Sequence, residues 1–338
     1  MLATPTISVV IPMYNSKDYI IECLNSLLQQ TAKDFEVIIV DDGSSDGSEH
    51  IVDQFAETCA YMRVIHQSNA GAIEARKVGD MAACGEYILN VDSDDFLSPN
   101  HLEVIIEEIR HRKPDVIVTG YTDYINGDMF KRFQNIPCGY YNKANIEKSI
   151  IPNLMSCGKF FNFGIYPTLW SSCIRRELLV QCQQTIEGKY SIGDDLSITY
   201  PAILNASSLS VIDATSYVYR IQENSITHVF DKNFSKKIIY LLSHLEKVLP
   251  TKTVLKKQFI DYVVFETCIL VSNYLGHGLK EQTYSESVQH IKSVLENEIV
   301  KNAFNEFHVW KRSMSIKWRI KIFLIKHRWF YIYKFLVN

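Results

Sequence analysis

A chain of 338 residues, of which 47% are hydrophobic and 22% charged, cannot be wholly disordered and is long enough for a catalytic domain with an additional region. The eight cysteines form neither a C-x-x-C pair nor a dense framework, which argues against a disulfide-rich secreted protein and favours a reducing compartment. The net charge of −3 is unevenly distributed, because residues 301–338 carry nine Lys and Arg residues against the single acid Glu306. This basic block predicts an anionic partner.

The N-terminal residues show no targeting pattern. No basic leader precedes the first apolar run, and Pro12 interrupts that run, so we expect no signal peptide. No stretch reaches the ~18 uninterrupted apolar residues of a typical membrane span. We therefore expect a cytoplasmic protein.

The first hundred residues alternate between short β-branched runs and segments in which apolar residues recur at helical spacing. Strands are predicted at 7–11, 35–40, 62–65 and 87–91, and helices at 17–30, 48–58 and 72–83. This order predicts an α/β fold with a Rossmann-like, mostly parallel sheet flanked by helices. Ligands of such sheets bind beyond the carboxyl ends of the strands.

The pattern changes twice further along the chain. A helix at 102–111 and a strand at 116–118 continue the alternation, and regularity then decreases through 120–165. From about residue 234 only helical spacing remains. We predict one domain over 1–230 and a helical C-terminal region over 231–338.

Two acidic clusters follow predicted strands, one at Asp41-Asp42 and one from Asp92 to Asp95. Asp92 and Asp94 could converge on a hard divalent cation, which prefers oxygen ligands and could neutralise a departing diphosphate. The alternative is a solvated acidic turn in which Asp95 or Ser98 caps the next helix. The position after a buried strand, with a second cluster beside it, favours a cation site.

Four motifs in this order resemble glycosyltransferase family 2, whose members have the GT-A fold. They are IPMYN from Ile11, DDGSSDG from Asp41, NAGAIEAR from Asn69 and GEYILNVDSDD from Gly85. The resemblance implies an inverting, nucleotide-sugar-dependent enzyme that uses Mn²⁺ or Mg²⁺. It divides the predicted domain into a nucleotide-sugar-binding half over 1–100 and an acceptor-binding half over 101–230.

The resemblance also assigns residues to the donor. Asp42 looks like the carboxylate that accepts a hydrogen bond from a uracil-type ring, Asp92 is similar to a residue facing the ribose and diphosphate, and Asp94 resembles the direct metal ligand. The complete predicted donor site comprises Pro12, Tyr14, Asn15, Asp41, Asp42, Arg76, Asp92, Ser93 and Asp94, with Asp94 and Asp92 at the metal. Pro12 and Tyr14 look like the wall beside the base. Arg76 approaches the diphosphate in one interpretation and is an ordinary surface residue in the other.

The resemblance places the catalytic base in an acidic dipeptide at the start of a later helix. Gly193-Asp194-Asp195-Leu196 resembles the family's pattern, with Asp194 where Glu is usual. A positioned carboxylate can take the proton of the attacking hydroxyl. We assign Asp195 as the base and Asp194 as the second choice. Both could instead be acids that stabilise the first turn of a helix.

Two further segments resemble the family, and one residue in each has two possible roles. In the YVYRIQENSI segment from Tyr217, Arg220 could pair with phosphate or with a local carboxylate. Trp170 precedes RRELL, and its ring could stack on a sugar or lie in the core.

The C-terminal segment 305–338 mixes aromatic and basic residues. Such a mixture suits the surface of an anionic membrane, although the basic residues fall in two sectors of a helical wheel. The alternative is a helical bundle whose Lys and Arg residues are merely solvated. No recognised nucleic-acid-binding fold accompanies the segment, so we expect no nucleic-acid partner.

Together these patterns predict a hexosyl- or N-acetylhexosaminyltransferase that moves a sugar from a UDP-sugar to a hydroxyl of a glycan or lipid-linked acceptor. We expect a role in surface polysaccharide, such as O-antigen, capsule or lipopolysaccharide, at the inner face of the cytoplasmic membrane. A nucleotidyltransferase or a dehydrogenase would show a glycine-rich loop after the first strand, where this chain has Pro12-Met13-Tyr14-Asn15. A non-catalytic binding protein on the same fold would have a damaged acidic motif, and here Asp42, Asp92, Asp94 and Asp195 are all present.

Overall fold

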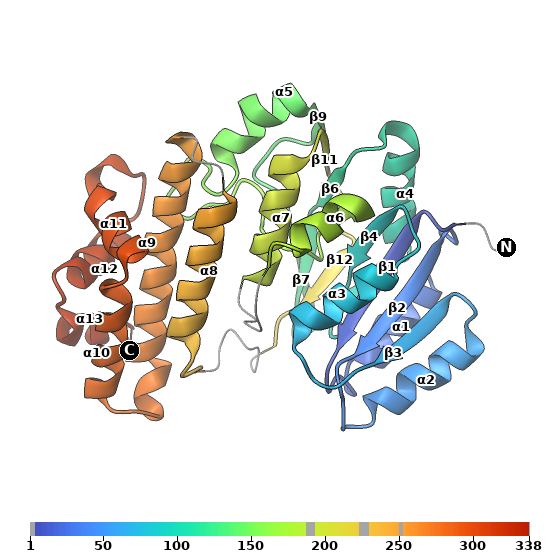
Figure 1. The fold of residues 1–338 in the computed structure, drawn as a ribbon, viewed down its shortest axis with the longest axis horizontal. Helices are drawn as coiled ribbons and strands as arrows, with labels where there is room; N and C mark the ends of the chain where they lie inside the picture. The colour runs from blue at the N-terminus through green and yellow to red at the C-terminus, as the bar shows by residue number, and fades with distance from the viewer. Residues whose placement is uncertain (1–3, 187–192, 223–229, 250–252, 338) are drawn as a thin grey trace. The chain divides into compact units, whose positions relative to one another are not determined.

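The structure is a computed structural model that describes residues 4–186, 193–222, 230–249 and 253–337. The chain forms two compact units, one from residues 1–148 and 165–222 and the other from residues 149–164 and 223–338 (Figure 1). The segment 149–164 lies within the predicted acceptor-binding half in sequence, yet it belongs to the unit of C-terminal helices. The boundary predicted near residue 230 adjoins 223–229, which lie outside the described residues.

The first unit is built on an eight-stranded sheet in the order β3-β2-β1-β4-β10-β6-β11-β9. Its first four strands are β1 (Ile7–Met13), β2 (Phe35–Asp41), β3 (Met62–His66) and β4 (Tyr87–Asn90), joined by α1 (Ile20–Leu28), α2 (Ser48–Thr58) and α3 (Ala72–Ala82). These four strands are parallel, and β1 pairs with β2 from Ile7 opposite Phe35 to Met13 opposite Asp41. The α/β fold with a mostly parallel sheet flanked by helices is thereby confirmed.

Strand β1 is buried along its whole length because helices cover both of its faces. Val9 and Ile11 belong to the same core cluster as Leu24 of α1. Val10 points to the other face, where α3 lies so close that Gly79 has room for no side chain. An apolar run without alternation is what such a doubly covered strand requires.

The second half of the sheet contains three strands that were not predicted from the sequence. After α4 (His101–Arg112) come β6 (Val116–Thr119), β9 (Gly139–Asn142), α5 (Lys143–Asn145), β10 (Ser172–Arg175), α6 (Arg176–Gln183), α7 (Asp194–Asn205) and β11 (Ser208–Ile212). Strand β10 enters between β4 and β6 and runs antiparallel to both. It therefore links the half of the sheet predicted from the first hundred residues to the half that follows.

A second sheet has the order β5-β12-β7-β8. Its strands are β5 (Phe96–Leu97), β7 (Tyr121–Ile125), β8 (Asp128–Arg132) and β12 (Tyr217–Arg220). Strands β7 and β8 form a hairpin around Asn126 and Gly127, which both have positive φ angles of 51° and 97°. Asn-Gly is the strongest short signal for such a turn, so this hairpin was predictable from the sequence and was overlooked.

The second unit is helical, as predicted for the C-terminal region. It contains α8 (Phe234–Val248), α9 (Thr253–Leu275), α10 (Tyr284–Leu295), α11 (Glu298–Glu306), α12 (Ile316–Lys326) and α13 (Phe330–Val337). Among the described residues one stretch, Val254–Lys280, is long and apolar enough to cross a membrane by length and composition, and 67% of its most apolar window is buried inside the structure. Such burial is that of a core helix, and α8, α10, α11, α12 and α13 all contact α9 (Figure 1).

Candidate active site

The loop after β4 carries the acidic cluster, and Asp95 anchors this loop to β12. Asp95 is 1% exposed and accepts hydrogen bonds from the Tyr217 hydroxyl (2.7 Å) and the Arg220 backbone N–H (2.8 Å). The Tyr217 oxygen in turn accepts the backbone N–H of Asp92 at 3.2 Å. Burial, and then the charges of Asp92 and Asp94, raise the pKa of Asp95. Asp95 therefore holds the loop in place and is no helix cap.

Asp94 is partly buried beside the carboxylate of Asp92. Asp94 accepts a hydrogen bond from Gln222 (3.0 Å), and Arg220 donates to its backbone carbonyl (2.9 Å). Burial, followed by the charge of Asp92, raises the pKa of Asp94 to about 6. The raised pKa means that lost hydration and the neighbouring charge of Asp92 destabilise the ionised form of Asp94, and a bound cation would stabilise that form.

Arg76 connects the loop after β4 to the predicted base. Its guanidinium donates from Nη2 to Asp92 Oδ1 at 2.7 Å, and Nη1 lies 3.5 Å from Asp195 Oδ1. The Arg76 side chain is 9% exposed, against 25% for Asp92 and 22% for Asp195. The interpretation of Arg76 as an ordinary surface residue is therefore wrong, because its cation lies between two carboxylates from separate parts of the chain.

Asp195 lies in the first turn of α7, which Gly193 precedes with a φ of 71°. The sequence is therefore folded as the dipeptide pattern predicted, with the acidic pair opening a helix. The side chain of Asp194 lies outside the described residues, so its place as second choice for the base stays a prediction.

A buried polar pair that was not predicted from the sequence lies next to Arg76. Asp80 follows Arg76 by one turn of α3, is 0% exposed, and accepts a hydrogen bond from Gln183 of α6. Burial raises the pKa of Asp80 to about 7, against smaller opposing effects from the Gln183 hydrogen bond and the Arg76 charge. An Asp at the fourth position after an Arg is usually a solvated helix pair in a sequence, and only its position against α6 shows otherwise.

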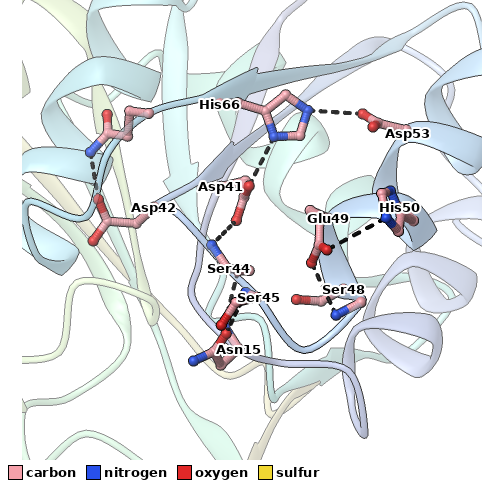
Figure 2. Close-up of polar contacts among 12 residues, drawn as sticks. Asn15, Asp41, Asp42, Ser44, Ser45, Ser48, Glu49, His50, Asp53 and His66 are labelled. Atoms are coloured by element: carbon pink, nitrogen blue, oxygen red, sulfur yellow. Dashed lines mark hydrogen bonds and ion pairs between the residues drawn. The ribbon is translucent and has the colours of Figure 1, made fainter.

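The first acidic cluster fixes two loops (Figure 2). Asp41 accepts the backbone N–H of Ser44 (3.0 Å) and bonds to His66 Nδ1 (2.8 Å), while His66 Nε2 bonds to Asp53 (3.0 Å). Burial alone would raise the pKa of Asp41, but the hydrogen bonds from Ser44 and His66 hold it below its usual value. The hydrogen bond to Asp41 raises the pKa of His66. His66 was not singled out by the sequence.

Asp42, the predicted partner of a uracil-type ring, holds the loop that precedes α3. Its two oxygens accept hydrogen bonds from Gln67 Nε2 (2.7 Å) and from the backbone N–H groups of Ala70 and Gly71 (both 2.8 Å). A carboxylate offers about four acceptor positions, so one further donor can still be accommodated. The contact with a base stays a prediction, and the loop contacts are an additional role.

The predicted wall of the base site lies where β1 ends. Pro12 is buried within the strand, whereas the Tyr14 side chain is 53% exposed. Asn15 has a φ of 48°, donates its N–H to Ser44 Oγ (3.0 Å), and accepts the Ser45 N–H at 2.9 Å. These contacts bring the loops after β1 and β2 together.

The loop after β1 also meets the acidic loop after β4. The hydroxyls of Ser16 and Ser93 lie 2.7 Å apart. Residues predicted from three separate motifs are thus gathered at the carboxyl ends of neighbouring parallel strands, where ligands bind in such sheets.

The structure gives local partners to both residues whose roles were open outside the four motifs. Arg220 forms an ion pair with Glu22 at 2.5 Å, and its guanidinium lies 5.1–5.3 Å from the ring centres of Tyr19, Phe96 and Tyr124. A contact of Arg220 with phosphate stays a prediction. Trp170 is 5% exposed and stacks on Tyr219 with ring centres 5.2 Å apart. It is a core residue in this structure.

The comparisons with known proteins decide the family. Residues 8–170 match the family described as glycosyl transferase family 2. The glycosyltransferase GlyG of Streptococcus pneumoniae is 32% identical over 242 residues, which cover 70% of this chain and 78% of GlyG. The chain belongs to glycosyltransferase family 2. The glycosyltransferase GlyA of the same organism is 28% identical over 243 residues, and there the chain spans only 34% of the relative's length.

Solved structures confirm the GT-A fold of this family 2 glycosyltransferase. S. aureus TarS 1-349 in complex with UDP-GlcNAc superposes with a TM-score of 0.68 at 20% identity, covering 98% of this chain and 90% of that one. The mannosyltransferase PcManGT from Pyrobaculum calidifontis, in complex with GDP-Man and Mn²⁺, has a TM-score of 0.52 at 14% identity and covers 99% and 86% of the two chains. These likenesses concern the fold alone.

Proposed function

We propose that this glycosyltransferase moves a hexosyl or N-acetylhexosaminyl group from a UDP-sugar to a hydroxyl of a glycan or lipid-linked acceptor, with inversion at the anomeric carbon. The observation that carries the proposal is the approach of Asp92, on the predicted donor side, and Asp195, the predicted base, to one guanidinium. The UDP and UDP-GlcNAc complexes of TarS support the choice of donor. The acidic motif is intact, which disfavours a non-catalytic binding protein.

The proposed reaction is a single displacement. Asp195 takes the proton from the acceptor hydroxyl as its oxygen attacks the anomeric carbon, and the bond to the nucleoside diphosphate breaks on the opposite face. Attack from the face opposite the leaving group inverts the configuration, so an α-linked donor gives a β-linked product. No covalent enzyme intermediate is needed. Asp194 is the alternative base in the same turn.

Asp94 and Asp92 are the proposed ligands of a divalent cation, Mn²⁺ or Mg²⁺. The described residues contain no group of three or more His, Cys, Asp or Glu side chains arranged as a complete metal site. This fits a cation that takes one or two protein carboxylates and completes its shell with phosphate oxygens and water. The raised pKa of Asp94, at about 6, fits the same arrangement. When bound, such a cation would neutralise the charge that develops on the departing diphosphate.

We further propose a cytoplasmic location and a role in surface polysaccharide synthesis, such as O-antigen, capsule or lipopolysaccharide. The cysteines support a reducing compartment, since five of the eight are buried, where a thiol behaves as a small hydrophobic side chain. The acceptor is to be identified separately from the donor, by screening candidate glycans and lipid-linked oligosaccharides.

Nucleotide release tests the proposed function. Purified chain is mixed with each of a panel of UDP- and GDP-sugars with Mn²⁺ or Mg²⁺, and free nucleotide is measured. Asp195→Asn should lower turnover by about 10²–10⁴-fold with the donor dissociation constant retained, because only proton transfer is removed. Asp94→Asn should weaken donor binding in the presence of metal. Asp128→Asn, at an exposed position of β8, is the control and should behave as the parent.

Absence of nucleotide release with every donor in the presence of acceptor extracts would contradict the proposed activity. Turnover at the parent rate in Asp195→Asn would remove its role as base, and loss of turnover in Asp194→Asn would then assign the base to Asp194.

A further inference from the structure

Helix α12 is apolar on both of its sides. On the inner side Ile322 and Ile325 are fully buried at 0% exposure, as expected for a helix packed on α9. On the outer side Ile316, Ile320 and Phe323 follow one another at spacings of four and three residues, which places them on one face. Their exposed fractions are 67%, 43% and 47%. A helix at the surface of a folded protein normally presents polar residues there.

Helix α13 also exposes apolar side chains. Tyr333 is fully buried and Phe330 nearly so, whereas Tyr331, Ile332 and Phe335 are 65%, 49% and 67% exposed. The two helices pack against each other (Figure 1). The outer face is defined here as Ile316, Ile320 and Phe323 of α12 with Tyr331, Ile332 and Phe335 of α13. Single exposed apolar residues are common, but a group on two adjoining helices marks an interaction surface.

The charge around the outer face selects the kind of partner. Residues 301–338 carry nine Lys and Arg residues and only one acid, Glu306, which pairs with Lys256 of α9. Within the described part of the chain, Lys317 and Lys334 pair with no carboxylate, and each is adjacent in sequence to a residue of the outer face. A second copy of the chain would bring a second basic surface and be repelled. An anionic surface would be attracted.

We propose that the outer face docks on an anionic lipid bilayer. The Ile, Phe and Tyr side chains enter the boundary between headgroups and acyl chains, and Lys317 and Lys334 remain among the lipid phosphates. Aromatic rings are favoured at this depth of a bilayer, and each Lys or Arg near an anionic leaflet is attracted by its negative surface potential. The outer face belongs to the helical unit and the predicted donor residues belong to the other unit. The test of the outer face requires no donor, so its failure would leave the proposed function untouched.

Deleting the segment 305–338 would be a poor test, because the same helices contribute to the core. The Tyr333 hydroxyl lies 2.8 Å from that of Ser272 in α9, and Arg312 pairs with buried Asp261 at 2.6 Å. Removing these contacts would expose α9, and altered partitioning could then result from unfolding. Substitutions confined to the outer face avoid this problem.

The experiment is co-sedimentation of the full chain with vesicles of phosphatidylcholine alone or of phosphatidylcholine with phosphatidylglycerol, at low and high salt. The parent should bind the anionic vesicles, lose most binding in high salt, and leave neutral vesicles largely unbound. The pair Ile320→Ser with Phe323→Ser should weaken binding roughly tenfold or more, because buried apolar area is lost. Lys317→Gln with Lys334→Gln should weaken it at low salt and reduce the salt dependence.

The matched control is Phe130→Ser with Phe133→Ser, which removes two aromatic side chains that are 49% and 50% exposed in the other unit. It should bind vesicles as the parent does, and all variants should keep the parent's melting temperature. Vesicle binding that is unchanged in the Ile320→Ser, Phe323→Ser pair overturns the proposal. Failure of the parent to bind anionic vesicles also overturns the proposal. This holds equally if the parent instead forms a dimer that these substitutions disrupt, or binds an oligonucleotide.

Discussion

At the scale of single residues, the main feature of the site is that one cationic side chain lies near two of its carboxylates. Arg76 contacts Asp92 directly and reaches Asp195 at 3.5 Å, so one guanidinium spans the donor side and the acceptor side of the proposed reaction. A guanidinium can do this because its donors diverge from a rigid plane, whereas an ammonium is a single compact charge. Arg76 is therefore a positioning residue for both carboxylates as well as a candidate for contact with the diphosphate.

Substitution of Arg76 tests this shared role. Arg76→Gln should lower kcat/KM by about 100-fold, because displacement of a reacting group by about 1 Å has a cost of this order. Arg76→Lys should recover donor binding more completely than kcat, since it restores charge but cannot span both carboxylates. The control is Lys77→Gln on the same helix, where Lys77 pairs with Glu74. Equal donor affinity and kcat in the parent and both Arg76 variants would contradict the role.

Asp80 should make stability depend on pH. Its pKa is about 7 in the folded chain, against an ordinary value of 3.8 for an Asp side chain, so the folded state retains a proton that the unfolded state releases between these values. As far as Asp80 is concerned, the free energy of unfolding is therefore highest below about pH 4 and decreases as the pH rises towards 7. Between about pH 5 and pH 8 this loss is about 2–3 kcal/mol.

Asp80→Asn should abolish this part of the pH dependence. The free energy of unfolding, measured with urea at several pH values, should decline less steeply in the variant than in the parent. Asp128→Asn provides the comparison, because Asp128 is exposed in β8. Parallel curves for parent and Asp80→Asn would show that Asp80 titrates normally.

At the scale of helices and strands, the sequence predicted the half of the fold whose elements are local in the chain. The helix predicted at 48–58 is α2 (Ser48–Thr58), and the strands predicted from residue 7 to residue 91 match β1 to β4 within two residues at each end. These strands are buried on both faces and therefore consist of unbroken apolar runs. They are easy to predict from sequence because a strand buried on both faces is apolar at nearly every position.

Elements stabilised by distant partners were missed. The four residues of β10 gain their place by pairing with β4 and β6, which lie more than fifty residues earlier in the chain. The residues of β8 are exposed throughout and have no burial pattern to read. Prediction of the site was limited in the same way: its motif residues were recognised from the sequence, whereas Asp80, His66 and Gln183 were not. Their roles depend on which elements adjoin them.

Gly79 tests how closely α3 must pack on the sheet. A Cβ at this position would collide with Val10 Cγ1 and lie 3.1 Å from Val40 Cγ2, both on stiff β-branched side chains. Gly79→Ala should therefore destabilise the chain by about 1–3 kcal/mol despite the better helix propensity of Ala. It should also lower kcat/KM, because the displaced helix carries Arg76.

The control for this substitution is Met81→Ala on the solvent side of the same helix, where Met81 is 76% exposed. Its free energy of unfolding should lie within about 0.5 kcal/mol of the parent's. If Gly79→Ala were as stable as the control, α3 would have room that the structure does not show.

At the scale of the whole molecule, the two compact units interrupt each other in sequence. The segment 149–164 is held within the helical unit by Gln258 of α9. The Gln258 side chain accepts the backbone N–H groups of Met155 (2.7 Å) and Ser156 (3.2 Å) and donates to the carbonyl of Ile151 (2.9 Å). One buried amide therefore satisfies three backbone groups of a segment that has little regular structure of its own.

Gln258→Leu should destabilise the helical unit by about 2–4 kcal/mol, since buried backbone groups lose their partners. Binding of UDP with Mn²⁺, measured by calorimetry, should be unchanged because the proposed donor residues all belong to the other unit. Lys257→Ala, at the exposed neighbouring position, should alter neither quantity. Loss of donor binding together with loss of stability would show that the two units depend on each other.

The interrupted order has a consequence during synthesis on the ribosome. Gln258 follows Met155 by 103 residues, so at ordinary translation rates the segment around Met155 waits roughly 5–20 s for its partner. The first unit, by contrast, has its whole sequence once Gln222 has emerged. A nascent chain could thus complete the unit that carries the proposed donor site while the helices bearing the outer face are still being made, so that donor binding could begin before docking on a bilayer.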